Sequence, residues 1–283
     1  MSLLQLIIIA LVQGVTEWLP ISSSGHVLLA ANLFTLEGRD ELLINAVSNL
    51  GTLAAMLIYF RKDVGAAILG GFELLGAGFR KLPLSRGAHL ALCIIVATPI
   101  ALIAAIAHES LIPDTIQANL RSVWTVAGAT IGFGLLLWWA DVAGGKTRTE
   151  ADMTIGHAVM IGATQAIAAL IPGTSRSGIT MTTARALGYE RTEAARFSML
   201  IGAPILAAAG LYGALGLLNT GGADGVVTPQ DGMIVAVLAF VSGLASIHAL
   251  MTLIKRMTFL PFVIYRLVLG FGLILAAPVL GLI

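Results

Sequence analysis

Long runs of apolar residues recur along this chain, and the polar residues gather in the short segments between them. An α-helix needs about 20 apolar residues to cross a bilayer, and a soluble domain does not contain a series of such runs. Runs of this length predict membrane-crossing helices at 41–60, 87–107, 122–142, 197–218, 232–254 and 260–283. We therefore expect an all-α, polytopic integral membrane protein that forms a single membrane domain over residues 1–283.

The basic residues predict which connections face the cytoplasm, because cytoplasmic loops are enriched in Lys and Arg. The basic connections contain Arg61, Lys62, Arg80, Lys81, Arg86, Lys146, Arg148, Lys255 and Arg256. The connections 108–121 and 219–231 are poor in Lys and Arg, so they are expected on the outer face. A solvated cytoplasmic charge cluster is expected from Arg185, Glu190, Arg191, Glu193 and Arg196. Segment 64–79 is interpreted as an interfacial helix or a loosely packed connection.

Two further apolar segments, 3–34 and 154–187, are each broken at the centre by a proline and a run of small polar residues. The alternation of sides requires each segment to return to the side on which it began. We therefore expect two re-entrant helical hairpins, the first entering from outside and the second from the cytoplasm. Non-helical backbone at membrane depth must be enclosed by protein or line a wet cavity, so the two tips should meet near the bilayer midplane.

The two broken segments also resemble each other. Three residues around the first break recur 152 positions later: Gln13, Pro20 and Ser23 correspond to Gln165, Pro172 and Ser175. Combined with the opposite entry sides, this predicts an inverted-topology repeat with halves 1–142 and 154–283.

Composition narrows the function classes. Hydrophobic residues make up 58% of the chain, charged residues make up 11%, and the formal net charge is +1. A basic surface for nucleic acid is therefore not expected. Cys93 is the single cysteine, so neither a disulfide nor a cysteine zinc site is expected. The first 12 residues contain no Lys or Arg, and we expect no removable signal peptide.

The first tip, 13–26, contains a candidate cation site. Gln13 and Glu17 are four residues apart and share a helix face. Their oxygens suit a divalent cation such as Mg²⁺ or Ca²⁺, shared with phosphate oxygens and water. The alternative is that Glu17 caps a helix or pairs with a buried arginine. An ionisable residue within the membrane favours the functional interpretation.

The same tip contains candidate anion-binding groups. Ser22, Ser23, Ser24 and Gly25 begin the returning helix, where unpaired N–H groups and the helix dipole attract an anion. Ordinary serine capping is the alternative. His26 lies in the first helical turn, where the dipole favours the neutral ring and leaves a nitrogen free to attack or to accept a proton. A structural histidine is the alternative for this position.

The second tip, 172–178, repeats this design and adds an arginine. Thr174, Ser175, Ser177 and Gly178 supply hydroxyls and a helix start. The guanidinium fork of Arg176 matches two phosphate oxygens, although Glu17 is an alternative partner. We expect Arg176 to pair with Glu17 in the empty site and with substrate in the occupied one. The two tips together predict a site for a lipid that carries two phosphates.

Five stretches, 13–26, 49–52, 59–63, 172–178 and 260–266, resemble the undecaprenyl-diphosphate phosphatase family of membrane enzymes linked to bacitracin resistance. The two tip motifs together are the specific part of the match. The resemblance implies hydrolysis of undecaprenyl diphosphate to undecaprenyl phosphate and phosphate at the outer face of the bacterial cytoplasmic (inner) membrane. This reaction recycles the lipid carrier for peptidoglycan synthesis.

The resemblance also implies roles for individual residues. Glu17 corresponds to the family's acidic residue, Ser23 to its essential serine, Ser24 to the adjacent hydroxyl, His26 to its histidine and Arg176 to its arginine. The family has Glu or Gln at the position of Gln13. Asn49 stands where many members have His or Gln, and we assign it no catalytic role.

These residues suggest a mechanism. Glu17 and Gln13 would hold the cation, and Arg176 and the tip amides would bind the terminal phosphoryl group. His26 is favoured as the nucleophile, or as the base that activates Ser23 or water. The expected partners are a polyprenyl diphosphate and membrane lipids, and the sequence leaves open whether the chain forms a homodimer.

Two other functions fit parts of the pattern. Inverted repeats with broken helices also serve transporters, so a transporter or flippase for a phosphorylated lipid or anion is the main alternative. An intramembrane serine protease is a weaker alternative, because peptide cleavage gives Arg176 no evident role.

Overall fold

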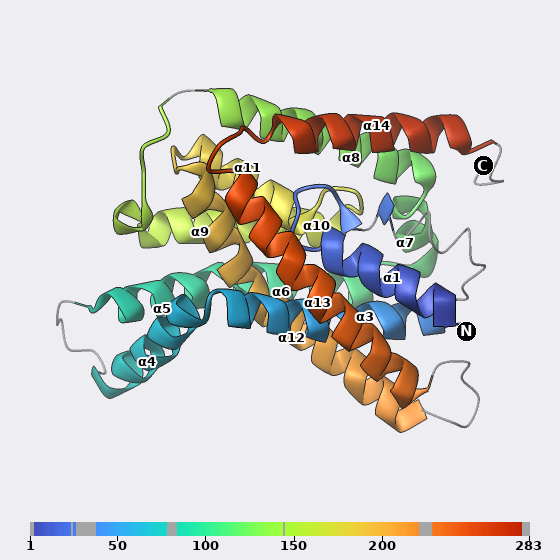
Figure 1. Ribbon diagram of the computed structural model, residues 1–283, viewed down its shortest axis with the longest axis horizontal. Helices are drawn as coiled ribbons and strands as arrows, with labels where there is room; N and C mark the ends of the chain where they lie inside the picture. The colour runs from blue at the N-terminus through green and yellow to red at the C-terminus, as the bar shows by residue number, and fades with distance from the viewer. Residues whose placement is uncertain are drawn as a thin grey trace.

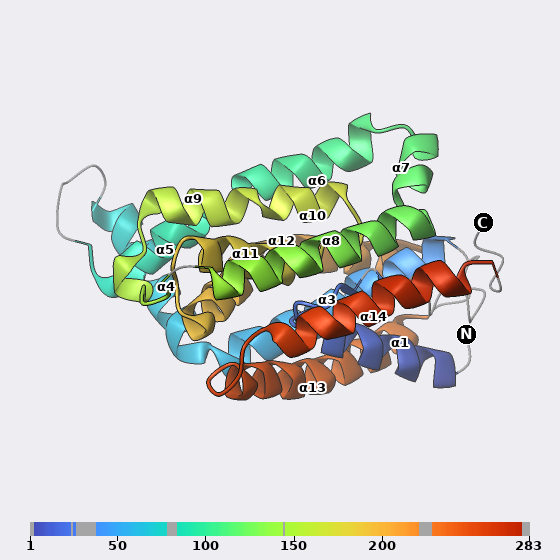
Figure 2. The same ribbon diagram turned by 90° about the horizontal axis from the view of Figure 1, so that it is seen from above.

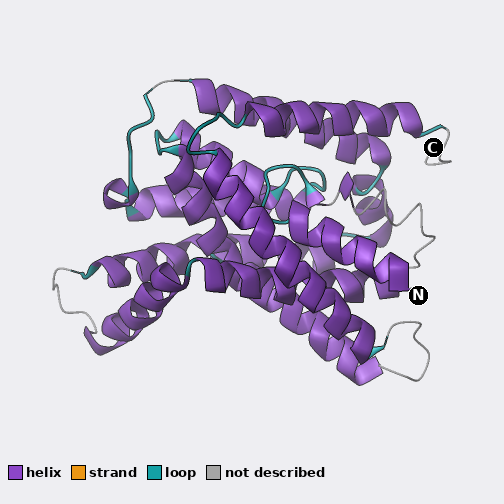
Figure 3. Ribbon diagram, in the orientation of Figure 1, coloured by secondary structure: helices purple, strands orange, loops and turns teal. Residues whose placement is uncertain are grey.

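The computed structural model describes residues 3–23, 25–26, 38–77, 84–143, 145–220 and 228–278. Within these ranges the regular elements are helices, and one isolated β-bridge joins Arg148 to Tyr189 (Figure 3). The helices are α1 (Leu3–Thr16), α3 (Gly38–Tyr59), α4 (Arg61–Ala77), α5 (Arg86–Ala97), α6 (Pro99–Leu111), α7 (Asp114–Leu120), α8 (Val123–Val142), the 3₁₀ helix η1 (Glu150–Asp152), α9 (Ile155–Ala163), α10 (Gln165–Leu170), α11 (Arg176–Ala186), α12 (Arg191–Thr220), α13 (Pro229–Leu253) and α14 (Leu260–Ala276). The predicted all-α class is confirmed.

Four helical segments in the described part of the chain are long and apolar enough to cross a membrane. They are Arg86–Leu111, which joins α5 and α6, Val123–Val142, Arg191–Gly216 and Pro229–Leu253. These segments correspond to four of the predicted crossings and identify a multi-pass membrane protein. The other two predicted crossings coincide with α3 and α14, whose apolar described parts, Ala46–Tyr59 and Leu260–Ala276, are shorter.

The helices pack along the long axis of the molecule, and two of them end near its middle. Figures 1 and 2 show α14 beside α8, and α1 packs against α13. In Figure 2, α9 and α10 run inward from the end that carries α4 and α5, whereas α1 runs inward from the opposite end. The loops that follow α1 and α10 therefore lie close together in the interior.

Small residues allow the helices to approach each other closely. Gly162 in α9 faces the backbone of Ala97 in α5, and Gly51 in α3 faces the backbone of Ala236 in α13. A Cβ atom at either glycine would collide with these backbone atoms. This backbone contact is typical of helix interfaces in lipid, where packing replaces the hydrophobic driving force.

One end of the molecule carries a network of ion pairs. Arg86 and Arg196 both donate to Asp63 and Glu150, with N–O distances of 2.6 to 2.8 Å. Burial alone would raise the pKa of both carboxyls, but the hydrogen bonds and charges of the two arginines outweigh it and hold the pKa of Asp63 and of Glu150 below their ordinary values. The network joins three segments that the sequence assigns to the cytoplasmic side.

Arg185 differs from the expectation of a solvated charge. Its side chain is buried and donates from Nε to Oδ1 of Asp141 at 2.8 Å. Asp141 also accepts from Arg191 at 2.9 Å and from the backbone N–H of Phe259 at 3.0 Å. This buried carboxylate ties α8, α11, α12 and the start of α14 together, so the sequence interpretation of Arg185 was wrong.

Candidate active site

Both broken segments restart as helices on a serine with the same unusual backbone. Ser22 has φ 72° and Ser175 has φ 69°, in the left-handed region that non-glycine residues avoid. The Ser22 hydroxyl accepts from the N–H of Gly25 at 3.4 Å, and the Ser175 hydroxyl accepts from the N–H of Gly178 at 3.1 Å. The two caps correspond at an offset one residue longer than the 152 positions seen in the sequence, because the second tip has one more residue between its proline and its cap.

The two tips are in direct contact. The Ser177 hydroxyl lies 3.0 Å from the carbonyl oxygen of Leu19 and 3.3 Å from that of Glu17, and it donates to them. Arg176 Nη2 donates to Glu17 Oε1 at 3.1 Å, and only about a tenth of each side chain is exposed, at 13% and 10%. The Arg176 guanidinium also lies 5.1 Å from the ring centroid of Trp18. Two regions far apart in the sequence thus build one charged site.

The second carboxylate oxygen of Glu17 faces the first tip. Glu17 Oε2 accepts from Gln13 Nε2 at 3.0 Å and from the Ser23 hydroxyl at 3.4 Å. Gln13 Nε2 donates as well to Asn49 Oδ1 at 3.1 Å. Asn49, which the sequence left without a role, therefore fixes the orientation of the Gln13 amide.

These contacts define how a cation would fit. Glu17 offers a carboxylate of the type that Mg²⁺ and Ca²⁺ prefer. Gln13 directs its N–H₂ group at Glu17, so its amide must rotate before its oxygen faces the same cation. Within the described residues, no group of three or more His, Cys, Asp or Glu side chains is arranged to hold a metal ion.

His26 makes different contacts from those of Glu17 and Arg176. Its Nδ1 lies 2.7 Å from the carbonyl oxygen of Ser22, and its Nε2 lies 2.6 Å from the hydroxyl of Tyr265. A carbonyl only accepts, so Nδ1 carries the hydrogen, and in the neutral ring Nε2 accepts from Tyr265. The two rings are stacked with centroids 5.5 Å apart. Both nitrogens of His26 are engaged away from the Glu17 carboxylate.

The remaining predicted site residues that the structure describes form hydrogen bonds within the tips. The Thr174 hydroxyl donates to the carbonyl of Ile171 at 2.7 Å, and the hydroxyls of Ser175 and Ser177 lie 3.3 Å apart. Gly25 and Gly178 supply the capped N–H groups. Ser24, predicted to bind phosphate, lies outside the described residues.

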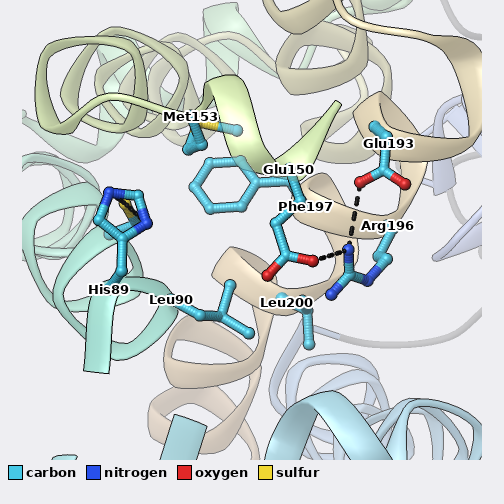
Figure 4. Close-up of a pocket in the computed structure, with 9 residues that line it drawn as sticks. His89, Leu90, Glu150, Met153, Glu193, Arg196, Phe197 and Leu200 are labelled. Atoms are coloured by element: carbon cyan, nitrogen blue, oxygen red, sulfur yellow. Dashed lines mark hydrogen bonds and ion pairs between the residues drawn. The ribbon is translucent and has the colours of Figure 1, made fainter. Parts of the chain in front are cut away.

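A separate small cavity lies at the end that carries the ion-pair network (Figure 4). Its volume is about 10 Å³, and it is lined by His89, Leu90, Cys93, Glu150, Met153, Glu193, Arg196, Phe197 and Leu200. Arg196 donates to Glu150 at 2.6 Å and to Glu193 at 3.1 Å, so its charge is already neutralised. None of the predicted site residues lines this cavity, and the tip contacts remain the candidate active site.

Comparison with known proteins assigns the chain to a family. The family model described as "Bacitracin resistance protein BacA" matches residues 6–272. The chain belongs to the BacA family. It is 64% identical, over 99% of both chains, to a protein of Hyphomonas neptunium named undecaprenyl-diphosphatase. It is 43% identical to a protein of the same name from Maricaulis maris, over 97% of this chain and 98% of the relative.

The structure adds residues to the site of this BacA-family chain that sequence reasoning did not assign. Trp18 lies under Arg176, Asn49 holds Gln13, and Tyr265 holds His26. Arg266 contacts the backbone of both tips. Tyr265 and Arg266 belong to the stretch 260–266 that resembles the phosphatase family. The sequence predicted Arg266 only as a buried or snorkelling cation paired within the bundle and gave neither residue a role in the site.

Proposed function

We propose that this chain is an undecaprenyl-diphosphatase, which hydrolyses undecaprenyl diphosphate to undecaprenyl phosphate and phosphate. The BacA family match and the 64% identical relative of that name support the substrate and the reaction. The single observation that carries the proposal is the Glu17–Arg176 contact between the two tips. It joins a phosphate-binding guanidinium to a carboxylate inside an apolar protein.

In this proposal the chain crosses the bacterial inner membrane six times, and segments 3–34 and 154–187 are re-entrant hairpins of an inverted repeat. The convergence of α1 and α10 on the middle of the molecule supports this arrangement, as do the similar caps on Ser22 and Ser175 (Figure 2). The site then opens toward the outer face, where it recycles the lipid carrier of cell-wall synthesis. The match to a family described by bacitracin resistance supports a role of this chain in that resistance.

Binding of the substrate exchanges one partner of Arg176. In the empty site its fork rests on Glu17, and in the occupied site it turns to the terminal phosphoryl group, where two N–H groups match two oxygens. The first turn of α11, capped by Ser175, adds backbone N–H groups and the positive end of the helix dipole. The diphosphate thereby replaces the carboxylate that neutralises Arg176.

The contacts support Ser23 over His26 as the nucleophile. The Ser23 hydroxyl donates to Glu17, which is positioned to take its proton, whereas both nitrogens of His26 are occupied. Ser23 Oγ attacks the terminal phosphorus, the bond from that phosphorus to the bridging oxygen breaks, and undecaprenyl phosphate leaves. Water then attacks the phosphorus of phosphoserine, and the bond from that phosphorus to Ser23 Oγ breaks. Ser23 Oγ takes back the proton held by Glu17, the Glu17 carboxylate accepts the proton that the attacking water loses, and phosphate is released.

A divalent cation remains part of the proposal. Mg²⁺ or Ca²⁺ bound between Glu17 and the diphosphate oxygens would neutralise charge on the leaving group. The residues of the chain provide Glu17 as a ligand, and Gln13 after rotation of its amide. Because the cation depends on substrate oxygens, we expect weak binding of the metal to the protein alone.

Phosphate release by the purified protein tests the proposed function. The wild type in detergent should release phosphate from undecaprenyl diphosphate. The Glu17→Gln variant, once size-exclusion chromatography shows that it is folded, should release none. A transporter or flippase for the same lipid would redistribute it across vesicle leaflets without releasing phosphate. That outcome would replace the proposed function with the transport alternative.

A further inference from the structure

Arg266 on α14 is fully buried, with 0% of its surface exposed, and no ion pair links it to a carboxylate of the described residues. All of its hydrogen bonds go to backbone carbonyl oxygens. The acceptors are Thr130 at 2.9 Å from Nε, Thr174 at 3.0 Å and Pro20 at 3.4 Å from Nη1, and Gly173 at 3.1 Å and Ala129 at 3.4 Å from Nη2.

The hydrogen-bond count limits what this residue can do. A guanidinium has five N–H groups, and five carbonyl contacts use all of them. Arg266 therefore has no donor left for a phosphate oxygen. Any effect of Arg266 on phosphate binding is therefore indirect and depends on the backbone segments whose carbonyls it contacts.

Three of the five carbonyls that Arg266 holds lie where helices are interrupted, and the other two, Ala129 and Thr130, lie within α8. Pro20 belongs to the first tip, and Gly173 and Thr174 belong to the second. Carbonyls at such breaks lack a partner within their own helix and are costly to leave unpaired in a bilayer. One side chain thus supplies donors to both tips and fixes their positions relative to each other.

The same contacts set the direction of a peptide group beside the candidate phosphate site. A trans peptide is planar, so the Thr174 carbonyl that points at Arg266 directs the N–H of Ser175 the opposite way. Ser175 itself has φ 69° and ψ 111°, a strained conformation that persists only where the surroundings impose it. Arg266 holds the preceding residue through the Thr174 carbonyl, and the Ser175 hydroxyl accepts from the N–H of Gly178.

We propose that Arg266 is a positioning residue for phosphoryl transfer. It locks the two tips in register and holds the Gly173–Ser175 backbone so that the N–H groups at the start of α11 face the terminal phosphoryl group. This role rests on the proposed phosphatase function.

Two glycines accommodate the Arg266 side chain and provide a test. A Cβ added to Gly134 of α8 would lie 3.2 Å from Cβ and Nε of Arg266, whereas a Cβ added to Gly132 of the same helix would meet nothing within 4 Å. Gly134→Ala therefore displaces Arg266 by a few tenths of an ångström without changing its charge. Gly132→Ala is the matched control, and both substitutions raise helix propensity.

The experiment measures kcat and KM for phosphate release separately, well below the melting temperature of each variant. Arg266→Lys keeps the charge but loses the five-donor fork. It should lower kcat about 100-fold while KM stays within about threefold, because misplaced groups cost transition-state stabilisation. Gly134→Ala should lower kcat about tenfold, and Gly132→Ala should leave it unchanged.

Arg185→Lys controls for general instability, because Arg185 is also a buried arginine but pairs with Asp141 at the other end of α11. We expect it to lower the melting temperature while kcat per folded molecule stays at the wild-type value. If Arg266→Lys and Arg185→Lys lose activity only in proportion to lost folded protein, the positioning role is overturned. Equal kcat values for Gly134→Ala and Gly132→Ala would overturn it as well. A wild type that releases no phosphate would overturn the proposed function, and this role with it.

Discussion

Glu17 and Arg176 are separated by 159 positions in the sequence, and their side chains form a 3.1 Å ion pair between the two broken helices. Breaking such a mostly buried pair by removing one partner is unfavourable, because the other charge is left without compensation. A diphosphate resolves this problem, since it brings its own negative charge to Arg176. The pair therefore keeps the site neutral when empty and makes it selective for an anion.

Replacement of Arg176 by lysine tests this exchange. Arg176→Lys keeps the positive charge but loses the two-pronged contact with phosphate and the guanidinium's contact with the Trp18 ring. We expect kcat/KM for phosphate release to fall at least about 100-fold. Arg191→Lys is the control, because Arg191 is more exposed and lies far from the tips in the ion pair with Asp141. Comparable activity of the two variants would contradict the phosphate-binding role of Arg176.

The identity of the nucleophile predicts where a trapped phosphoryl group is found. Substrate labelled in the terminal phosphate, quenched during turnover, should label Ser23, because its hydroxyl contacts Glu17. The quench and the peptide mapping must be done at neutral or alkaline pH as well as in acid, since phosphohistidine is lost in acid. Ser23→Ala should show no label. Label on His26 would restore the mechanism favoured by the sequence.

Removal of divalent cations tests the proposed metal. Chelation should abolish phosphate release by the wild type, and addition of Mg²⁺ or Ca²⁺ should restore it. Glu17 is the one carboxylate among the described residues of the site, so we expect the protein alone to bind the metal weakly. The chelator should therefore cause little change in the melting temperature of the substrate-free protein. Full activity in chelator would remove the cation from the account, while leaving the Arg176 contact in place.

The ion-pair network predicts an acid-labile end of the molecule. The folded pKa values of Asp63 and Glu150 lie below their ordinary values of 3.8 and 4.5, so their stabilising contribution is complete above about pH 5.5 and is lost as the pH falls through the folded pKa values. Melting temperatures in detergent should therefore fall below pH 4.5. Asp63→Asn should cost roughly 1 to 3 kcal/mol at pH 7 and flatten this acid dependence. The control Glu109→Gln also replaces a carboxylate by an amide, but at an exposed position. It should change neither the free energy of unfolding at pH 7 nor the acid dependence of the melting temperature.

The apolar pattern predicted the four helices that are long and apolar enough to cross a membrane, because this pattern depends only on local sequence. The runs at 122–142 and 232–254 coincide closely with α8 and α13. The same reasoning was wrong for Arg185, whose partner Asp141 lies on another helix. The sequence alone does not distinguish an arginine that faces solvent from one that pairs with a buried carboxylate on another helix. Such an ion pair is identified only from the three-dimensional structure.

The sequence predicted the site residues that lie within the two tip motifs. The pairing of Arg176 with Glu17 was among the alternatives drawn from the sequence. The contacts of Tyr265 with His26 and of Arg266 with Pro20 were not, because 239 and 246 residues separate these partners. The register of the caps was also missed by one residue, since a left-handed serine leaves no signature in residue type.

The most direct measurement is an experimental structure of the Ser23→Ala protein with undecaprenyl diphosphate bound. The account predicts the terminal phosphate between the two tips, within hydrogen-bond distance of Arg176 and of the first N–H groups of α11, with the Glu17–Arg176 ion pair released. A diphosphate bound elsewhere, with the Glu17–Arg176 pair unchanged, would contradict it.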